Sequence, residues 1–86
     1  MDELISICIP TYRRPSLLRA GVESCLRQAY RPLQILIGDD SGDRRGVDAL
    51  ETLQLPTGVI CRHVVHDPPL RQAGNVNWLF ANADGE

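Results

Sequence analysis

The sequence predicts an α/β fold in which three strands alternate with three helices. Three apolar runs of strand length lie at residues 4–10, 33–40 and 59–65. The segments that follow them repeat apolar residues every three or four positions, which is the spacing of an amphipathic helix. Right-handed crossovers in a βαβαβα order make the strands parallel, and we expect the spatial order 3-2-1.

The composition excludes several classes of protein. The 86 residues are 43% hydrophobic and 23% charged, which is typical of one globular unit, and the net charge of −2 argues against a nucleic-acid partner. Cys8, Cys25 and Cys61 lie in apolar runs without C-x-x-C spacing, so we expect reduced, buried thiols and no zinc. Asp2 and Glu3 stand where a signal peptide would be basic, and no apolar run approaches the ~18 residues of a membrane span. We therefore expect a cytoplasmic protein, with membrane association through parts outside this chain left open.

The first two strands flank a helix. Residues 4–10, "LISICIP", show little alternation, which indicates a strand covered on both faces, and Pro10 ends it. A helix begins near Pro15 and closes before Pro32, and its apolar stripe comprises Leu18, Val22, Cys25, Leu26 and Ala29. Residues 33–40, "LQILIGDD", form the second strand, and "SGDRRG" is a loop.

The second half of the chain is more polar. A short helix is expected at residues 47–54, and "VICRHVV" at 59–65 is typical of a strand near a sheet edge. His63 and His66 should point to opposite faces of that strand as ordinary surface side chains. The last helix covers residues 71–83. Its buried stripe is predicted to be Val76, Leu79, Phe80 and Ala83, with Trp78 opposite and exposed unless another segment covers it.

The expected order 3-2-1 places the apolar first strand at an edge of the sheet. Its backbone groups on that side lack a partner, which invites pairing with another chain. We therefore expect that residues 1–86 are an incomplete domain, with a strand after Glu86 covering this edge, or a domain that a partner completes. By itself, the chain should self-associate there.

This topology also predicts where a ligand binds. It is one mononucleotide-binding half of a doubly wound fold, and ligands of such sheets bind outside the carboxyl ends of the strands. Three segments arrive there: "PTYRR" at 10–14, "DDSGD" at 39–43 and "HDPPLRQAGN" at 66–75. Asp39 and Asp40 should therefore face a cleft between these segments.

The residue types in this cleft describe a nucleoside diphosphate site. Ionised carboxylates only accept hydrogen bonds, so Asp39 and Asp40 would recognise base N–H groups or ribose hydroxyls. Tyr12 offers a ring for stacking on a base, and the arginines beside it suit phosphate oxygens. The residues also leave open the alternative that the two aspartates cap a turn and pair with Arg44 or Arg45.

Two stretches carry a family resemblance. Residues 5–43, "ISICIPTYRRPSLLRAGVESCLRQAYRPLQILIGDDSGD", resemble in order and spacing the N-terminal part of family 2 glycosyltransferases, which are GT-A fold enzymes that use nucleotide-diphospho-sugars. Residues 74–86, "GNVNWLFANADGE", are similar to the G-N-x-N helix that precedes the family's metal-binding strand. The resemblance implies that residues 1–86 are the Rossmann-like, N-terminal nucleotide-binding part of a GT-A domain, truncated before the D-x-D strand.

The resemblance also implies a set of nucleotide-sugar-binding residues: Pro10, Thr11, Tyr12, Arg14, Asp39, Asp40, Ser41 and Asn77. In this set the ring of Tyr12 would hold the base, and Asp40 would accept from the base N–H or the ribose. Asp39 would support Asp40 or share its role. Arg14 and Asn77 would reach the diphosphate or the loop around it.

The implied activity is transfer of a sugar, with a UDP-sugar as the expected donor, to a hydroxyl of a glycan or another acceptor with inversion. A divalent metal, Mn²⁺ or Mg²⁺, held by the D-x-D motif would neutralise the leaving diphosphate. No D-x-D follows "ADGE", and Asp84 and Glu86 are not expected to replace it. The resemblance therefore assigns no catalytic residue and no metal ligand to this chain, and it implies that the 86 residues alone are inactive.

Other families fit the motifs less well. Response-regulator receivers also have an acidic pair after an apolar strand, but the pair follows their first strand and they need a later lysine, which this chain lacks. The phosphate-binding motifs G-x-G-x-x-G and G-x-x-x-x-G-K-[ST] are both absent. A non-catalytic nucleotide-binding or dimerisation module remains the alternative to an enzyme.

Overall fold

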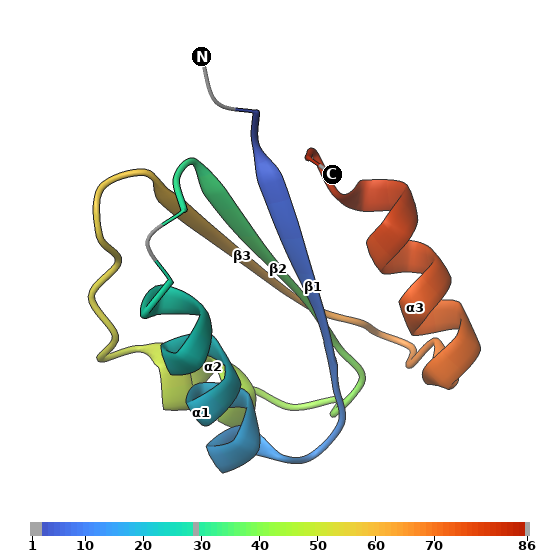
Figure 1. Ribbon diagram of the computed structural model, residues 1–86. Coiled ribbons are helices and arrows are strands. Elements are labelled where there is room, and N and C mark those ends of the chain that lie inside the picture. Colours follow the sequence, from blue (N-terminus) through green and yellow to red (C-terminus); the bar gives the residue numbers. More distant parts are fainter. Residues whose placement is uncertain (1–2, 29, 86) are drawn as a thin grey trace.

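The computed structural model describes residues 3–28 and 30–85, so the expectations for Asp2, Ala29 and Glu86 lie outside it. Six elements follow one another along the chain (Figure 1): β1 (Ile5–Thr11), α1 (Pro15–Leu26), β2 (Leu33–Asp39), α2 (Arg45–Leu50), β3 (Val59–Val65) and α3 (Arg71–Asn82). The predicted βαβαβα order is confirmed. The second helix was expected at residues 47–54 and is observed at Arg45–Leu50, so it begins and ends earlier; at its first residue the N–H of Arg45 donates to the Asp43 carboxylate (3.0 Å).

The sheet is parallel, and β2 lies at its centre. Its order is β1-β2-β3, and Ile5, Leu33 and Val59 stand side by side at the start of the three strands. The order was expected as 3-2-1 and is observed as β1-β2-β3; the two name the same neighbours from opposite edges, because β2 pairs with both other strands. All seven residues of β2 are buried, as expected for a central strand with helices on both faces.

The three helices are divided between the two faces of the sheet. Figure 1 shows α1 and α2 together on one face and α3 on the other, where α3 contacts β1 and β2. Successive side chains of a strand point to opposite faces. On the α1/α2 face, alternate strand residues meet α1 in an apolar core made of Leu18, Val22, Leu33, Ile35, Ile37 and Val59.

The buried stripe of α3 differs from the prediction. Leu79 is 1% exposed and Asn75 is buried, but Phe80 is 74% exposed. Trp78 is half-buried and packs edge-on against His66, with ring centroids 4.7 Å apart. The expectation that Phe80 faces the sheet and Trp78 points away was therefore wrong. The buried face of α3 includes a polar residue, Asn75. A prediction from apolar residues alone could not include it, and it therefore rotated the buried face by about one residue toward Phe80.

Polar contacts connect the end of α3 to the start of the strands. Gln34 donates its amide Nε2–H to Asp84 Oδ2 (2.8 Å) and accepts from the Asp84 N–H at Oε1 (3.0 Å). Ser6 accepts from the Gly85 N–H (2.8 Å) and donates its hydroxyl to Gln34 Oε1 (2.6 Å). Within the described residues β1 pairs only with β2, and self-association through its other side stays a prediction.

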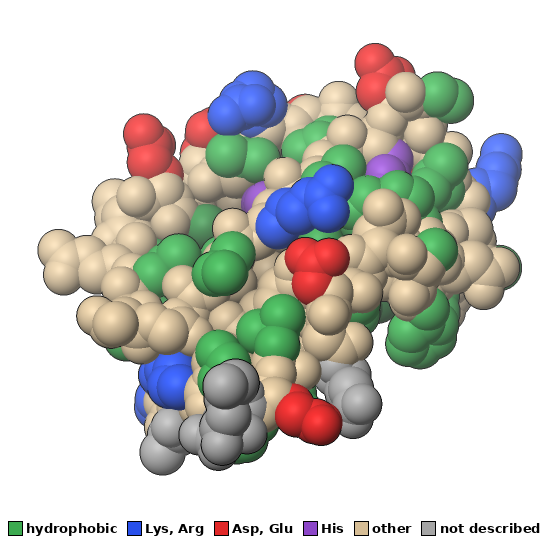
Figure 2. All heavy atoms as spheres, turned by 90° about the horizontal axis from the view of Figure 1, so that it is seen from above, with side chains coloured by type: hydrophobic (Ala, Val, Ile, Leu, Met, Phe, Trp, Pro, Cys, Tyr) green, Lys and Arg blue, Asp and Glu red, His purple; other side chains and the backbone are tan. Residues whose placement is uncertain are grey.

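The surface and the thiols add two observations. On the face drawn in Figure 2, acidic and basic side chains are interspersed. Cys8, Cys25 and Cys61 are free and half-buried, and burial raises the pKa of each thiol, which favours the protonated, less reactive form. None of the helices in the described part of the chain is both long and apolar enough to cross a membrane.

Candidate functional site

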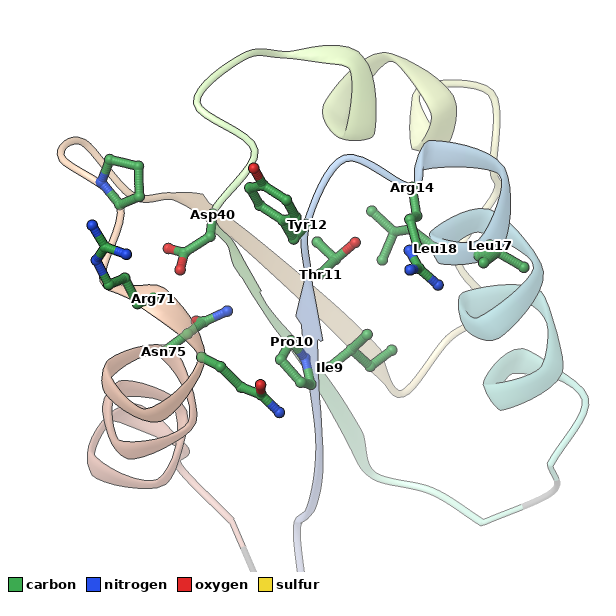
Figure 3. Close-up of a pocket in the computed structure, with 12 residues that line it drawn as sticks. Ile9, Pro10, Thr11, Tyr12, Arg14, Leu17, Leu18, Asp40, Arg71 and Asn75 are labelled. Carbon is green, nitrogen blue, oxygen red and sulfur yellow. The ribbon is translucent and has the colours of Figure 1, made fainter.

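A cleft opens at the carboxyl ends of β1 and β2, between the start of α1 and the start of α3 (Figure 3). Its volume is about 750 Å³. The cleft is lined by Ile9, Pro10, Thr11, Tyr12, Arg14, Leu17, Leu18, Asp40, Pro69, Arg71, Gln72 and Asn75. The position follows from the topology, because helices on opposite faces of the sheet leave the end of β1 uncovered between them.

Asp40 forms a fixed acidic group in the wall of this cleft. It is 5% exposed, and its backbone N–H donates to the Thr11 carbonyl (2.9 Å), so the residue continues the pairing of β2 with β1. Its Oδ1 accepts from the N–H of Leu70 (3.0 Å), just before α3. Among the described residues Oδ2 has no hydrogen-bond partner. The carboxylate is therefore held in place while one oxygen stays available to a ligand that donates a hydrogen bond.

An aromatic ring and two cationic side chains line the same cleft. Tyr12 is 55% exposed, and the Arg13 guanidinium carbon lies 5.1 Å from the centre of its ring. Arg14 and Arg71 are exposed and come from opposite sides, before α1 and at the start of α3 (Figure 3). Two guanidinium groups beside one carboxylate give the cleft residues a net positive charge, which suits a phosphorylated ligand.

The start of α3 is docked on β2 by one buried amide. Asn75 donates its Nδ2–H to the Gly38 carbonyl (2.8 Å), and its Oδ1 accepts from Nε2–H of His66 (2.9 Å). Gly38 permits this approach, because a Cβ there would lie 2.1 Å from Asn75 Oδ1. The sequence prediction did not include Asn75, Arg71 or Gln72 in the site, although all three lie in the segment expected to reach it. The G-N-x-N motif was the available signal for Asn75.

Asp39 does not line the cleft, contrary to the expectation that both aspartates face it. It is 0% exposed and points to the α1/α2 face. Its Oδ1 accepts from the Ser41 N–H (2.9 Å) and its Oδ2 from Nε2–H of His63 (2.7 Å). Adjacent residues of a strand point to opposite faces, so only one member of the pair can reach the cleft.

Neither Asp39 nor Asp40 pairs with Arg44 or Arg45 in the described residues, so this part of the alternative was wrong. Arg45 pairs instead with Asp43, at 2.9 Å between Nη2 and Oδ2. This contact lowers the pKa of Asp43, chiefly through the hydrogen bond from the Arg45 side chain. The turn part of the alternative does apply to Asp39, since it accepts from the N–H two residues ahead.

Two other predicted residues lie outside the cleft lining. Ser41 is buried behind the Tyr12 turn, where its Oγ accepts from the Arg13 N–H (2.7 Å). Asn77 is exposed on α3. Its neighbour Asn75 lines the cleft instead, because α3 turns that position toward the sheet. The structure thus brings five predicted residues together in the cleft: Pro10, Thr11, Tyr12, Arg14 and Asp40.

The histidines were expected to be ordinary surface side chains, and this expectation was wrong. His63 is part-buried against Asp39, and His66 is buried against Asn75. Their partners lie on opposite sides of the sheet, as expected from their spacing. Each histidine partners a buried polar group, which apolar periodicity does not reveal. No group of three or more His, Cys, Asp or Glu side chains within residues 3–28 and 30–85 is arranged to hold a metal ion.

Comparison with known proteins agrees with this arrangement. The family model described as "Glycosyl transferase family 2" matches residues 6–86, which is nearly the whole chain. A protein of Haemophilus influenzae described as an "Uncharacterized glycosyltransferase" is 30% identical over 50 residues. That match covers 58% of this chain and 20% of the relative, so the aligned part spans about a fifth of the length of that protein. No solved structure matches this chain.

Proposed function

This chain belongs to glycosyl transferase family 2, and from that premise we propose that it supplies the nucleoside diphosphate site of an enzyme that transfers a sugar. The donor would be a nucleotide-diphospho-sugar, with UDP as the expected nucleotide, and the acceptor a hydroxyl group on a glycan or another molecule. The matched part covers 20% of the relative, and the activity, donor and acceptor of the whole protein are therefore proposed.

The observation that carries the proposal is the position of Asp40. The Leu70 N–H holds its carboxylate at the cleft wall, its backbone N–H is bonded to the Thr11 carbonyl, and one carboxylate oxygen keeps its capacity to accept. A group fixed in this way recognises a donor without losing further side-chain freedom on binding. Imide N–H groups of a pyrimidine and the hydroxyls of a ribose are donors of this kind.

The other cleft residues support the same ligand. The exposed Tyr12 ring offers a flat surface for the base, while the carboxylate accepts from its edge. Arg14 and Arg71 enter from opposite sides and would contact the diphosphate oxygens, where guanidinium groups form paired hydrogen bonds. A nucleoside diphosphate would thus extend from the Tyr12 ring toward the two arginines.

These residues bind and orient the donor in the proposed reaction. The acceptor oxygen attacks the anomeric carbon, and the bond from that carbon to the diphosphate breaks, so the leaving diphosphate takes the electron pair. The arginines would stabilise its negative charge. Family members commonly use a divalent metal for this purpose, and the residues that the structure describes contain no cluster that would hold one. The base that removes the acceptor proton is not assigned to this chain.

The decisive experiment is a chemical-shift titration of the full chain with UDP and with GDP, each with and without Mg²⁺. We expect saturable shifts at the amides of Tyr12, Asp40 and Arg71. Asp40→Asn should weaken binding by at least about tenfold. Its Oδ1 can still accept from the Leu70 N–H, but an NH2 group replaces the second oxygen and would meet the ligand's donor with another donor.

The matched control is Asp43→Asn, which changes an acidic side chain of the same loop outside the cleft lining. It should leave the affinity within about twofold of the unsubstituted chain, since it removes only an exposed ion pair. Absence of shifts in a folded chain, or equal effects of the two substitutions, contradicts the proposal.

The open side of β1 favours a second candidate, a non-catalytic nucleotide-binding or dimerisation module. Within the described residues, β1 leaves one row of backbone groups without a strand partner. We expect the purified chain to dimerise with increasing concentration in sedimentation velocity runs. A monomer at every concentration counts against pairing through β1, whereas the UDP titration tests the nucleotide site independently.

A further inference from the structure

A chain of hydrogen bonds, buried at its centre and part-buried at its two ends, leads from β3 to the turn that lines the cleft. Nε2–H of His63 donates to Asp39 Oδ2 (2.7 Å), and Asp39 Oδ1 accepts from the Ser41 N–H (2.9 Å). Ser41 Oγ then accepts from the Arg13 N–H (2.7 Å), immediately after Tyr12. Four residues from three separate segments of the chain are thus connected without a gap, and we call them the His63 relay.

The last member of the relay adopts an unusual backbone conformation. Arg13 has φ of 51°, in the left-handed region that residues other than glycine rarely occupy. Such a conformation persists only where surrounding contacts hold it. The turn at Arg13 directs the chain from β1 into α1, so that Tyr12 and Arg14 both line the cleft. The Ser41 hydroxyl is the acceptor that holds this turn from inside the protein.

The first members of the relay lie where a lost partner cannot be replaced easily. Asp39 is fully buried, and the start of α2 packs directly on it. A Cβ on Gly46 would lie 2.6 Å from Asp39 Oδ2 and 3.2 Å from His63 Cε1. If His63 could not donate, a buried carboxylate oxygen would be left without its partner. Asp39 would then shift toward another donor and move Ser41 with it.

We propose that His63 is a positioning residue for the cleft: through Asp39 and Ser41 it holds the Arg13 turn that presents Tyr12 and Arg14 to the ligand. The histidine lies on the face of the sheet away from α3 and is absent from the cleft lining, so it acts through the relay. This inference rests on the proposed function for the identity of the ligand, but the relay itself can be tested without any nucleotide.

The first test is amide hydrogen exchange of the full chain without ligand. His63→Leu should raise the exchange rate of the Arg13 and Ser41 amides about tenfold, beyond any change shared by the whole chain. His63→Gln carries an amide donor near the position of Nε2 and should keep both rates within about threefold of the unsubstituted chain. Cys61→Ala is the control, because Cys61 lies two residues away on the same face of β3 and does not contact Asp39 through a hydrogen bond.

The second test is UDP affinity of the same variants. We expect His63→Leu to bind UDP about tenfold more weakly, with His63→Gln and Cys61→Ala both within about threefold of the unsubstituted chain. If the unsubstituted chain does not bind UDP, the proposed function fails, and the exchange rates still decide on the relay. Unchanged exchange at Arg13 in His63→Leu, or failure of His63→Gln to restore it, overturns the inference.

A third measurement covers the case in which the leucine variant does not fold. Nitrogen chemical shifts of the His63 ring in the unsubstituted chain report which nitrogen carries the proton. The relay requires a proton on Nε2, because the Asp39 carboxylate only accepts. A ring without a proton on Nε2 overturns the inference.

Discussion

The α1/α2 face of the sheet and its α3 face are both covered by helices, but they are held by different contacts. On the α1/α2 face, a continuous apolar core surrounds one polar pair, Asp39 with His63. On the α3 face, buried polar groups dock the helix at both ends: Asn75 on Gly38 near the cleft, and Gln34 on Asp84 at the opposite end. The α3 face therefore combines apolar burial with specific hydrogen bonds at both ends of the helix.

This difference explains why two adjacent aspartates have different environments. The residues of β2 alternate between the faces, so Asp39 enters the closed α1/α2 side and Asp40 follows on the side of α3, where the cleft is open. Both oxygens of Asp39 accept hydrogen bonds within the protein, whereas one oxygen of Asp40 has no partner among the described residues. The acidic pair at this strand end thus comprises two different environments, one inside the protein and one that faces the cleft.

The strongest test of the comparison concerns adjacent residues on α3. Leu79→Ala should lower the free energy of unfolding by about 3 kcal/mol, because it leaves a cavity between α3 and the sheet. Phe80→Ala should change it by less than about 0.5 kcal/mol, since the ring is largely exposed. Urea unfolding followed by Trp78 fluorescence measures both values on the α3 face, where the chain's one tryptophan lies. Equal losses would show that α3 is docked through the apolar stripe predicted from the sequence.

A smaller effect is expected where the two faces differ in their polar contacts. Gly38→Ala should cost about 2 kcal/mol, because the new methyl group would displace the Asn75 amide from its partners. Gly21→Ala is the matched control, since a Cβ there meets no atom within 4 Å and alanine favours the helix by up to about 1 kcal/mol. Urea midpoints that move together, in either direction, would mean that Asn75 does not hold α3 on β2.

Local patterns in the sequence were sufficient for the elements and the place of the cleft. Apolar runs and helical spacing identified every strand and helix, since burial repeats with the period of each backbone conformation. Turn residues at the strand ends, with the crossover rule, placed the cleft and the segment at residues 10–14 that lines it. Asp40 was found because it stands at the end of an apolar strand. These signals are local in the sequence, so they can be recognised without knowing which other segments lie nearby in the fold.

What the sequence alone could not provide was the orientation of polar residues inside the fold. Asn77 was chosen over Asn75, and Phe80 was placed against the sheet, because a buried asparagine is indistinguishable from a surface one until its partners are known. Asp39 was expected to face the cleft beside Asp40 for the same reason, because its partners were not known.

The sequence by itself thus determined the βαβαβα order, the parallel strands and the family, all of which follow from short-range periodicity and motif spacing. Only the tertiary structure decided that His63 supports Asp39, that Asn75 docks α3, and that one aspartate of the pair reaches the cleft. The physical reason is that a buried polar group needs a specific partner, and that partner comes from another part of the chain, brought near only by folding.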